Sequence, residues 1–258
     1  MVGALVFVVL LAAFIWWELR TALPLLELRL FQRKLVALGV AVGWISFLGT
    51  SATRFMMPFY LQRVIGLSPG EVGLLMIPPA LCMVVVGPLS GRLSDKFGWR
   101  RFTTGGLALS ATASFILASS LTESPVALIV AVLMFQSTGT GLFNSPNNSS
   151  IFSAVERSRY GVVSALTQLV RNSANVVSVA MATTIVVTVM GLRGVAPSLD
   201  AVSPQVADAF VAGLRLAFLI LGSALAIGVA LTLIRGERAK AVAPATNTQA
   251  RVSEASSD

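Results

Sequence analysis

Apolar residues occur in seven long runs along the chain, separated by short polar segments. The runs cover residues 2–17, 35–61, 72–91, 102–121, 126–153, 160–190 and 209–234. A helix that crosses a bilayer needs about 20 predominantly apolar residues. The pattern therefore predicts an all-α integral membrane protein with about seven transmembrane helices. The first run lacks the basic start and the cleavage site of a signal peptide, so we expect a short retained span.

Composition agrees with a membrane protein. Hydrophobic residues make up 55% of the 258 positions and charged residues 12%, against about 25% charged residues in soluble domains. The net charge of +8 would also suit a nucleic-acid-binding protein. However, the basic residues cluster between apolar runs, without the aromatic and basic surface pattern of such proteins, so we expect no nucleic acid as a partner.

The residue types that serve metal sites and catalysis are scarce. The chain contains no His, and Cys82 is its single cysteine, placed inside an apolar run. This excludes a disulfide framework and disfavours metal binding and His-based chemistry. We expect a protein that is not an enzyme and has no cofactor and no metal.

The distribution of basic residues predicts the orientation in the membrane. Most of the 19 Lys and Arg residues fall in segments 18–34, 92–101 and 154–159 and in the tail from Arg235. Because Lys and Arg are concentrated in cytoplasmic loops, we expect these segments and the C-terminus to be cytoplasmic and the N-terminus outside. The same pattern divides the chain into an extra transmembrane helix with a cytoplasmic surface segment at 1–34, six helices at 35–234 and a disordered cytoplasmic tail at 235–258.

Four stretches carry a resemblance to a known family. Residues 91–101 are predicted to form a short basic loop between two apolar runs. They read G-R-L-S-D-K-F-G-W-R-R, which resembles the cytoplasmic signature of the major facilitator superfamily. Three others resemble its fourteen-helix drug:proton antiporter branch: residues 24–31, residues 58–62 with Gly66 and Pro69, and residues 139–147 followed by Arg159-Tyr160-Gly161. The resemblance covers residues 1 to about 236, and the four stretches in this order make it specific.

The resemblance also implies which part of such a transporter the chain matches. An extra span precedes the six helices, and residues 176–190 lack the Gly- and Pro-rich signature of an amino-terminal half. The chain therefore resembles a carboxyl-terminal six-helix half. Alternating access in this family uses two halves around a central site, so the resemblance implies an amino-terminal half as a partner, besides the lipid bilayer and a small hydrophobic or amphipathic substrate.

The function that this resemblance implies is proton-coupled multidrug-type efflux across the cell membrane, performed as one half of a secondary transporter. A transport-inactive membrane fragment or scaffold protein is the alternative. A seven-helix retinal protein would need a lysine in its last span, but Lys34, Lys96 and Lys240 all lie outside the predicted spans. A seven-helix receptor would leave the four stretches unexplained.

The candidate gating residues are Gly91, Asp95, Gly98, Arg100 and Arg101. The glycines permit close approach and a tight turn, and Asp95 is predicted either to cap the next segment or to pair with Arg100 or Arg101. The resemblance implies a latch whose charge pairs form in one conformation and break in the other. A basic anchor at the membrane surface is the simpler interpretation.

The candidate substrate-binding residues are Arg54, Met57, Asn144, Arg171 and Asn175. Arg171 lies roughly 16 Å from the start of its span at 1.5 Å per residue, where a guanidinium needs protein or water around it. Asn144 lies at similar depth in the preceding span, and we hypothesise a polar network of Arg171 with Asn144 or Asn147. An interhelical clamp without substrate contact is equally consistent with the pattern.

Arg54 and Met57 have two interpretations each. Arg54 either snorkels to the outer interface or lines a cavity. Met57 belongs either to an adaptable substrate surface or to ordinary helix packing. All eleven acidic residues lie in loops, at helix ends or in the tail. Since proton coupling normally uses a titrating group inside the membrane, antiport would need one from another polypeptide.

Overall fold

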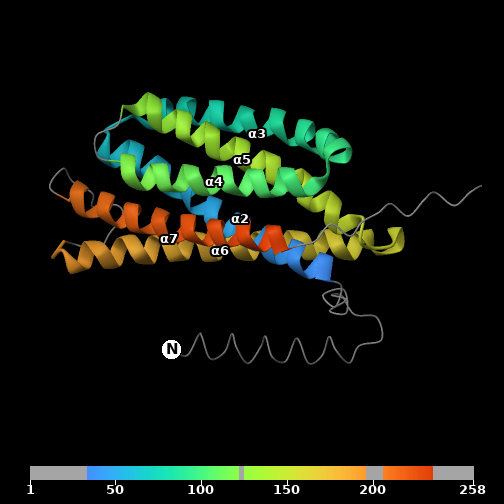
Figure 1. Cartoon of the computed structure of the whole chain (residues 1–258). Helices are drawn as coiled ribbons and strands as arrows, with labels where there is room; N and C mark the ends of the chain where they lie inside the picture. The colour runs from blue at the N-terminus through green and yellow to red at the C-terminus, as the bar shows by residue number, and fades with distance from the viewer. Residues whose placement is uncertain (1–33, 122–124, 196–205, 235–258) are drawn as a thin grey trace, which may run out of the picture.

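A computed structural model describes residues 34–121, 125–195 and 206–234, and these are almost entirely helical (Figure 1). The long helices are α2 (Lys34–Phe59), α3 (Pro69–Phe97), α4 (Trp99–Ser120), α5 (Val126–Phe152), α6 (Tyr160–Leu192) and α7 (Ala207–Ile234). A π-helical turn, η2 (Tyr60–Val64), extends α2, and a 3₁₀ turn, η3 (Arg157–Arg159), precedes α6.

The expected all-α membrane fold class is confirmed. Six helices within the described ranges are long and apolar enough to cross a membrane. They correspond to the six predicted runs from residue 35 onward. The predicted first span at 2–17, the surface segment that follows it and the tail from Arg235 lie outside the described residues.

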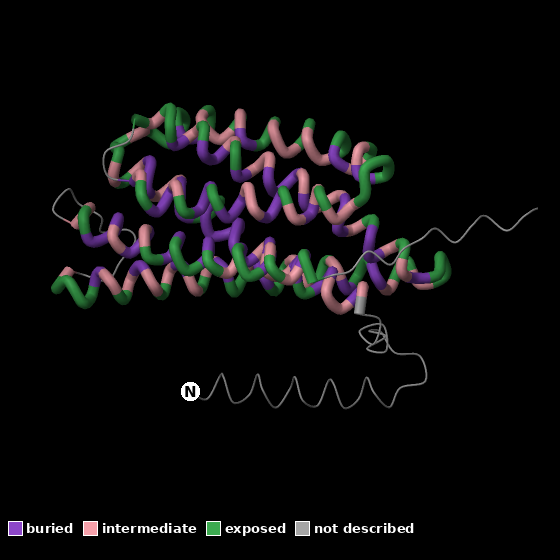
Figure 2. Tube along the Cα trace, in the orientation of Figure 1, coloured by how far each residue is buried: buried purple, intermediate pink, exposed green. Residues whose placement is uncertain are grey.

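The helices form a bundle in which α2 occupies the central position. In Figure 1, α3, α5 and α4 lie together above α7 and α6, and α2 crosses obliquely between the two groups. Helix α5 packs against α3 and α4, α7 against α4, α6 and α2, and α2 also against α6. Burial follows this arrangement (Figure 2), because 61% of the apolar window of α2 is buried but only 11% of that of α3 and 22% of that of α6.

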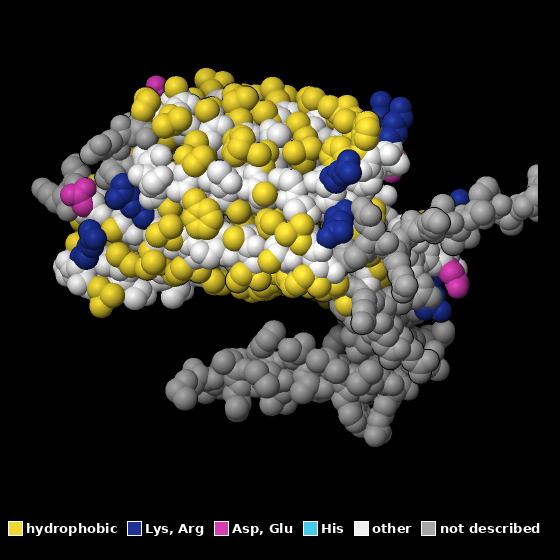
Figure 3. All heavy atoms as spheres, viewed as in Figure 1, with side chains coloured by type: hydrophobic (Ala, Val, Ile, Leu, Met, Phe, Trp, Pro, Cys, Tyr) yellow, Lys and Arg dark blue, Asp and Glu magenta, His cyan; other side chains and the backbone are white. Residues whose placement is uncertain are grey.

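Large side chains from α2, η2, α5 and α7 are among those that form the core. Met56, Tyr60, Phe143, Phe210 and Phe218 are all at most 1% exposed. Since lipid chains are as apolar as these residues, close packing and interhelical hydrogen bonds stabilise the bundle more than transfer from water does. The outer surface is apolar in its middle and carries Lys and Arg toward both ends (Figure 3), as a membrane-spanning bundle requires.

Helix α3 is longer at both ends than its predicted apolar run. At its start, Ser68 and Glu71 form a capping box: the Glu71 N–H donates to Ser68 Oγ at 3.3 Å, and the Ser68 N–H donates to Glu71 Oε2 at 2.8 Å. These bonds satisfy amide groups that the first turn of a helix leaves free. Polar residues that hydropathy assigns to a loop are thus part of the helix.

The prediction that residues 91–101 form a loop is wrong. Helix α3 continues to Phe97 and α4 begins at Trp99, so Gly98 is the whole connection. Gly98 has φ +87° and its N–H donates to Ser94 O at 2.9 Å. Only glycine adopts this backbone conformation without strain. The chain therefore reverses at one residue, and the basic side chains around it are carried by two helix ends.

Candidate functional site

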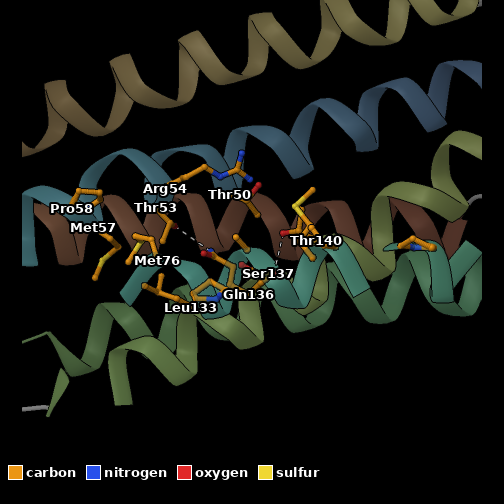
Figure 4. Close-up of a pocket in the computed structure, with 15 residues that line it drawn as sticks. Thr50, Thr53, Arg54, Met57, Pro58, Met76, Leu133, Gln136, Ser137 and Thr140 are labelled. Atoms are coloured by element: carbon orange, nitrogen blue, oxygen red, sulfur yellow. Dashed lines mark hydrogen bonds between the residues drawn. The ribbon is translucent and has the colours of Figure 1, made fainter. Parts of the chain in front are cut away.

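A cavity of about 630 Å³ lies between α2, α3 and α5 (Figure 4). Its wall combines an apolar side with a smaller polar side. The lining residues are Thr50, Thr53, Arg54, Met57, Pro58, Met76, Pro79, Ala80, Met83, Val84, Pro88, Leu133, Gln136, Ser137 and Thr140. A concave, mostly apolar site with a few polar groups is the usual form of a small-molecule site.

The apolar side of the cavity consists mainly of methionine and proline. Met57 comes from α2 and Met76 and Met83 from α3, and Pro58 and Pro79 lie beside them. Methionine is unbranched and polarizable, so it adapts to ligands of different shape. This side of the cavity suits the apolar part of a ligand without requiring one particular shape.

Gln136 organises the polar side. It is 5% exposed, and its Nε2 donates to Thr53 Oγ1 at 3.2 Å and to Ser114 Oγ at 3.2 Å. The bonds join α5 to α2 and α4 at the cavity wall. The sequence interpretation missed Gln136. A single glutamine in the apolar run 126–153, directly after ten apolar residues, was a usable signal, because buried amides require partners.

Two of the hydroxyl groups that line the cavity donate to their own helices. Thr50 Oγ1 donates to Ser46 O at 2.8 Å, and Thr140 Oγ1 donates to Gln136 O at 3.0 Å. With their protons engaged, these hydroxyl oxygens present mainly acceptor lone pairs. Hydrogen-bond donors for a ligand must therefore come from another residue of the cavity.

Arg54 and Met57, two of the predicted binding residues, line this cavity. Met57 is fully buried, whereas Arg54 is exposed. Figure 4 shows the Arg54 side chain extending along α2 toward Thr50. Arg54 is the single charged residue among the fifteen that line the cavity.

Arg171 and Asn175 lie on a different side of α2, where it packs against α6. The Arg171 guanidinium lies over the Phe47 ring, with 4.9 Å between Cζ and the ring centroid. Ser51 Oγ donates to Asn175 Oδ1. In each contact, Phe47 with Arg171 and Ser51 with Asn175, the α6 residue follows the α2 residue by the same number of positions. Helices α2 and α6 therefore run in the same direction through the bundle.

The hypothesised network of Arg171 with Asn144 or Asn147 is wrong. Asn147 Nδ2 donates instead to Gly39 O at 3.2 Å, and Arg171 Nε is buried without a hydrogen-bond partner in the described part of the chain. The reason is that α2 lies between α5 and α6, which hardly touch each other. Asn144 is partly buried on α5 and is not among the residues that line the cavity.

The gating residues are distributed over the ends of α3 and α4. Gly91 packs closely on α5: a Cβ added there would lie 2.6 Å from Ser145 Oγ. Arg100 donates from Nη2 to Leu233 O at the end of α7, whereas Asp95 and Arg101 are exposed.

Neither predicted contact of Asp95 is present in this structure. No ion pair joins Asp95 to either arginine in the described ranges, and the N-cap of α4 is Gly98, without a side-chain cap. Because α3 stays helical through Asp95, its carboxylate stands on the exposed face of that helix.

Acidic residues are confined to helix ends throughout the described ranges. Glu71 and Asp208 lie in the first turns of α3 and α7, Asp95 in the last turn of α3, and Glu156 just before η3. Within these ranges no group of three or more His, Cys, Asp or Glu residues is arranged to hold a metal ion. The cavity thus has cationic, amide and hydroxyl groups but no carboxylate.

Comparison with known families assigns the fold. The sequence model described as Major Facilitator Superfamily matches residues 1–179 and 42–256. The chain belongs to the Major Facilitator Superfamily. The resemblance carried by the four sequence stretches is therefore confirmed, and the protein is a multi-pass membrane protein of a family of transporters rather than enzymes.

Curated members of the superfamily match parts of the chain. It is 30% identical over 155 residues to the riboflavin transporter RibZ of Clostridioides difficile, which covers 60% of this chain and 34% of RibZ. It is 25% identical over 211 residues to the lincomycin resistance protein LmrB of Listeria monocytogenes, which covers 81% of this chain and 44% of LmrB. The methyl viologen resistance protein SmvA of Salmonella typhimurium is 36% identical over 109 residues, which is 42% of this chain and 22% of SmvA. The chain thus spans less than half the length of these relatives.

Proposed function

We propose that this superfamily member acts as the carboxyl-terminal half of a secondary, proton-coupled transporter that exports hydrophobic or amphipathic small molecules. The observation that carries the proposal is a polar, exposed face in the middle of membrane-spanning helices. Gln168 and Asn172 on α6 are exposed and bond to each other at 3.3 Å. Arg54 on α2 is exposed as well.

This face is unsuited to lipid. A charged residue at the centre of a transmembrane helix costs about 2.5–3.5 kcal/mol on insertion scales, and polar residues at such depth normally face protein or water. On α7, by contrast, Leu219 and Ile220 are exposed and apolar. A second helical half that covers α2 and α6 and encloses a water-filled pathway accounts for the difference.

The proposal includes the source of the coupling proton. The described spans contain no acid outside the first and last turns of their helices. The titrating group is accordingly assigned to the amino-terminal half. The proposed orientation places the ends of α3 and α4 around Gly98, with their basic residues, on the cytoplasmic side of the cell membrane.

Co-expression tests the proposal. The chain is produced alone, and together with the amino-terminal half of a relative such as LmrB, in cells that lack their own drug efflux pumps. Efflux of a fluorescent amphipathic dye is measured with and without a protonophore. We expect efflux only from the pair and its loss when the proton gradient is collapsed.

Cysteine cross-linking locates the second half independently of transport. In a Cys82→Ala background, Asn172→Cys is expected to cross-link to cysteines scanned along the co-expressed half, whereas Leu219→Cys on the lipid-facing side of α7 is the matched control. Efflux by the chain alone would refute the half-transporter. Cross-linking at Asn172 without efflux in any pair would favour the alternative, a transport-inactive scaffold protein.

A further inference from the structure

The charges inside the described spans are all positive. Arg171 and Arg215 lie more than about two helical turns from the nearest end of their helices at 3.6 residues per turn. Arg54 lies about one and a half turns before the end of α2, which η2 extends to Val64. The acids of these helices lie in first or last turns. A ligand that enters this half of the bundle therefore meets cations and no carboxylate.

Two of these arginines have partners within the bundle. Arg171 lies over the Phe47 ring, and Arg215 donates from Nη2 to Ser119 O at 3.5 Å. Arg54 has no hydrogen bond or ion pair with any other residue of the described part of the chain. It is also the arginine that lines the cavity (Figure 4).

The other polar groups on the cavity wall offer few free hydrogen-bond donors to a ligand. The amide donor of Gln136 is used by Thr53 and Ser114, and the hydroxyl protons of Thr50 and Thr140 are used by backbone oxygens. The Arg54 guanidinium is thus the main group of free donors on the wall. Its planar fork matches the oxygen pairs of carboxylates, sulfonates and phosphate esters.

We propose that the α2–α3–α5 cavity binds amphipathic organic anions, with Arg54 holding the anionic group and the Met57, Met76 and Met83 side holding the apolar body. The proposal narrows the substrate class of the transporter proposed above and rests on that function for its biological setting. Binding itself is a property of this chain. Hydrogen bonds from a guanidinium to an anionic group are charge-assisted and roughly twice as strong as those between neutral groups.

A matched set of ligands tests the charge preference. Full-length chain in phosphatidylcholine nanodiscs is titrated with pyrenebutyrate, with its neutral amide and with the pyrenebutyl-trimethylammonium cation, and the signal from empty nanodiscs is subtracted. We expect the anion to bind at least tenfold more tightly than the amide, and the cation more weakly than both. Equal affinity for all three, or a preference for the cation, overturns the proposal.

Two single-residue variants test whether Arg54 causes the preference for the anion. Arg54→Gln is expected to weaken binding of the anion by about tenfold to a hundredfold, as loss of hydrogen bonds to a charged group predicts, and to leave the amide unchanged. Arg63→Gln is the matched control, because Arg63 is exposed on η2 and does not line the cavity. An equal loss in both variants would show a non-specific surface-charge effect.

A second variant tests whether the ligand binds in this cavity, without altering the charge of the protein. Ala80 lines the cavity and is exposed, so Ala80→Phe is expected to fill it and weaken both anion and amide. Circular dichroism of each variant verifies that the helices are retained. If Ala80→Phe folds and binds the anion normally, the site is elsewhere.

Two further measurements are needed. One distinguishes an anionic lipid headgroup from a free organic anion as the ligand, and the other distinguishes failure of the binding proposal from failure of the proposed function. Nanodiscs with added phosphatidylglycerol show whether a lipid headgroup competes; strong competition means that the cavity takes anionic lipid rather than a free solute. Anion binding is also compared between the chain alone and the chain assembled with an amino-terminal half. If binding disappears on assembly, Arg54 pairs with a carboxylate of the second half. Either result overturns the proposal, whereas failure of efflux with intact anion binding overturns only the proposed function.

Discussion

The Arg171 guanidinium lies over the Phe47 ring, with Cζ 4.9 Å from the ring centroid, and this contact joins α6 to α2 inside the membrane-spanning bundle. A cation over an aromatic face contributes about 0.5–2 kcal/mol, the larger values applying where water is excluded. Phe47→Leu and Arg171→Met should each lower the free energy of unfolding by about this amount. In a double-mutant cycle, the double variant should lose less than the sum of the two.

Denaturation of the chain in mixed detergent micelles, followed by circular dichroism, measures these energies. Phe135→Leu is the control, because Phe135 is an exposed phenylalanine on α5 and should lose little. A coupling energy of zero between positions 47 and 171 would contradict the prediction. Unchanged efflux by the assembled transporter with Arg171→Ala would show that Arg171 only clamps helices and has no role in transport.

Ser178 supplies a second link between α6 and α2, at a fully buried position. Its Oγ donates to Leu48 O at 2.6 Å and accepts from the Ala52 N–H at 2.8 Å. Ser178→Ala should lower the free energy of unfolding by about 0.6–1.7 kcal/mol, the range measured for hydrogen bonds between membrane helices. The same detergent denaturation measures it.

Ser173→Ala provides the matched comparison on the same helix. Ser173 is exposed and bonds only within α6, to Val170 O at 3.0 Å. It should therefore change stability less than Ser178→Ala. If the two substitutions have the same effect, the interhelical bonds of Ser178 contribute nothing beyond those of an ordinary helix serine.

The sequence predicted which segments form helices far better than which helices contact each other. Apolar runs define which segments span a membrane, and Gly98 was predicted to make a tight turn. Depth along a span also follows from counting residues. Counting does not say which helices touch, however, so Asn144 and Arg171 were placed together at equal depth although α2 lies between their helices.

The candidate site was predictable only in part, because it too depends on which helices contact each other. Arg54 was singled out because a charge inside an apolar run requires an explanation, and the cavity lies beside it. Gln136 was overlooked because its role depends on Thr53 and Ser114, which belong to two other helices. The helical state of residues 91–97 was missed because hydropathy marks where lipid ends, whereas a helix continues until its backbone is interrupted.

Gly98 makes that interruption, and its replacement should destabilise the junction of α3 and α4. Its φ of +87° and ψ of 132° lie in a region that side chains with a Cβ rarely occupy, at a cost of about 1–3 kcal/mol. Gly98→Ala should lower the free energy of unfolding accordingly. Thermal denaturation in detergent measures the change.

A second glycine, Gly105, provides a control in which substitution by alanine should raise stability instead of lowering it. Gly105 is exposed within α4, and no atom lies within 4 Å of a Cβ added there. Gly105→Ala should stabilise the protein by about 0.5–1 kcal/mol, because alanine has the higher helix propensity. Destabilisation by both substitutions to the same extent would mean that the conformation of Gly98 is not the cause.

Arg100 anchors the start of α4 to the end of α7. Its Nη2 donates to Leu233 O, and Thr104 and Thr232 share a hydrogen bond at 2.9 Å one turn farther along. The last carbonyl groups of a helix lack partners within it and carry partial negative charge, so a cation there contributes about 0.3–1 kcal/mol. Arg100→Ala should lower stability by about this amount, and Arg100→Lys should retain part of it because the charge remains.

Arg101→Ala is the comparison that separates this contact from general surface charge. Arg101 is the exposed neighbour of Arg100 and contributes the same charge to the same end of the bundle. Detergent denaturation at low and high salt should show a loss for Arg100→Ala at both ionic strengths, since the hydrogen bond persists, and little change for Arg101→Ala. Equal, salt-sensitive losses in the two variants would assign the effect to surface charge and not to the end of α7.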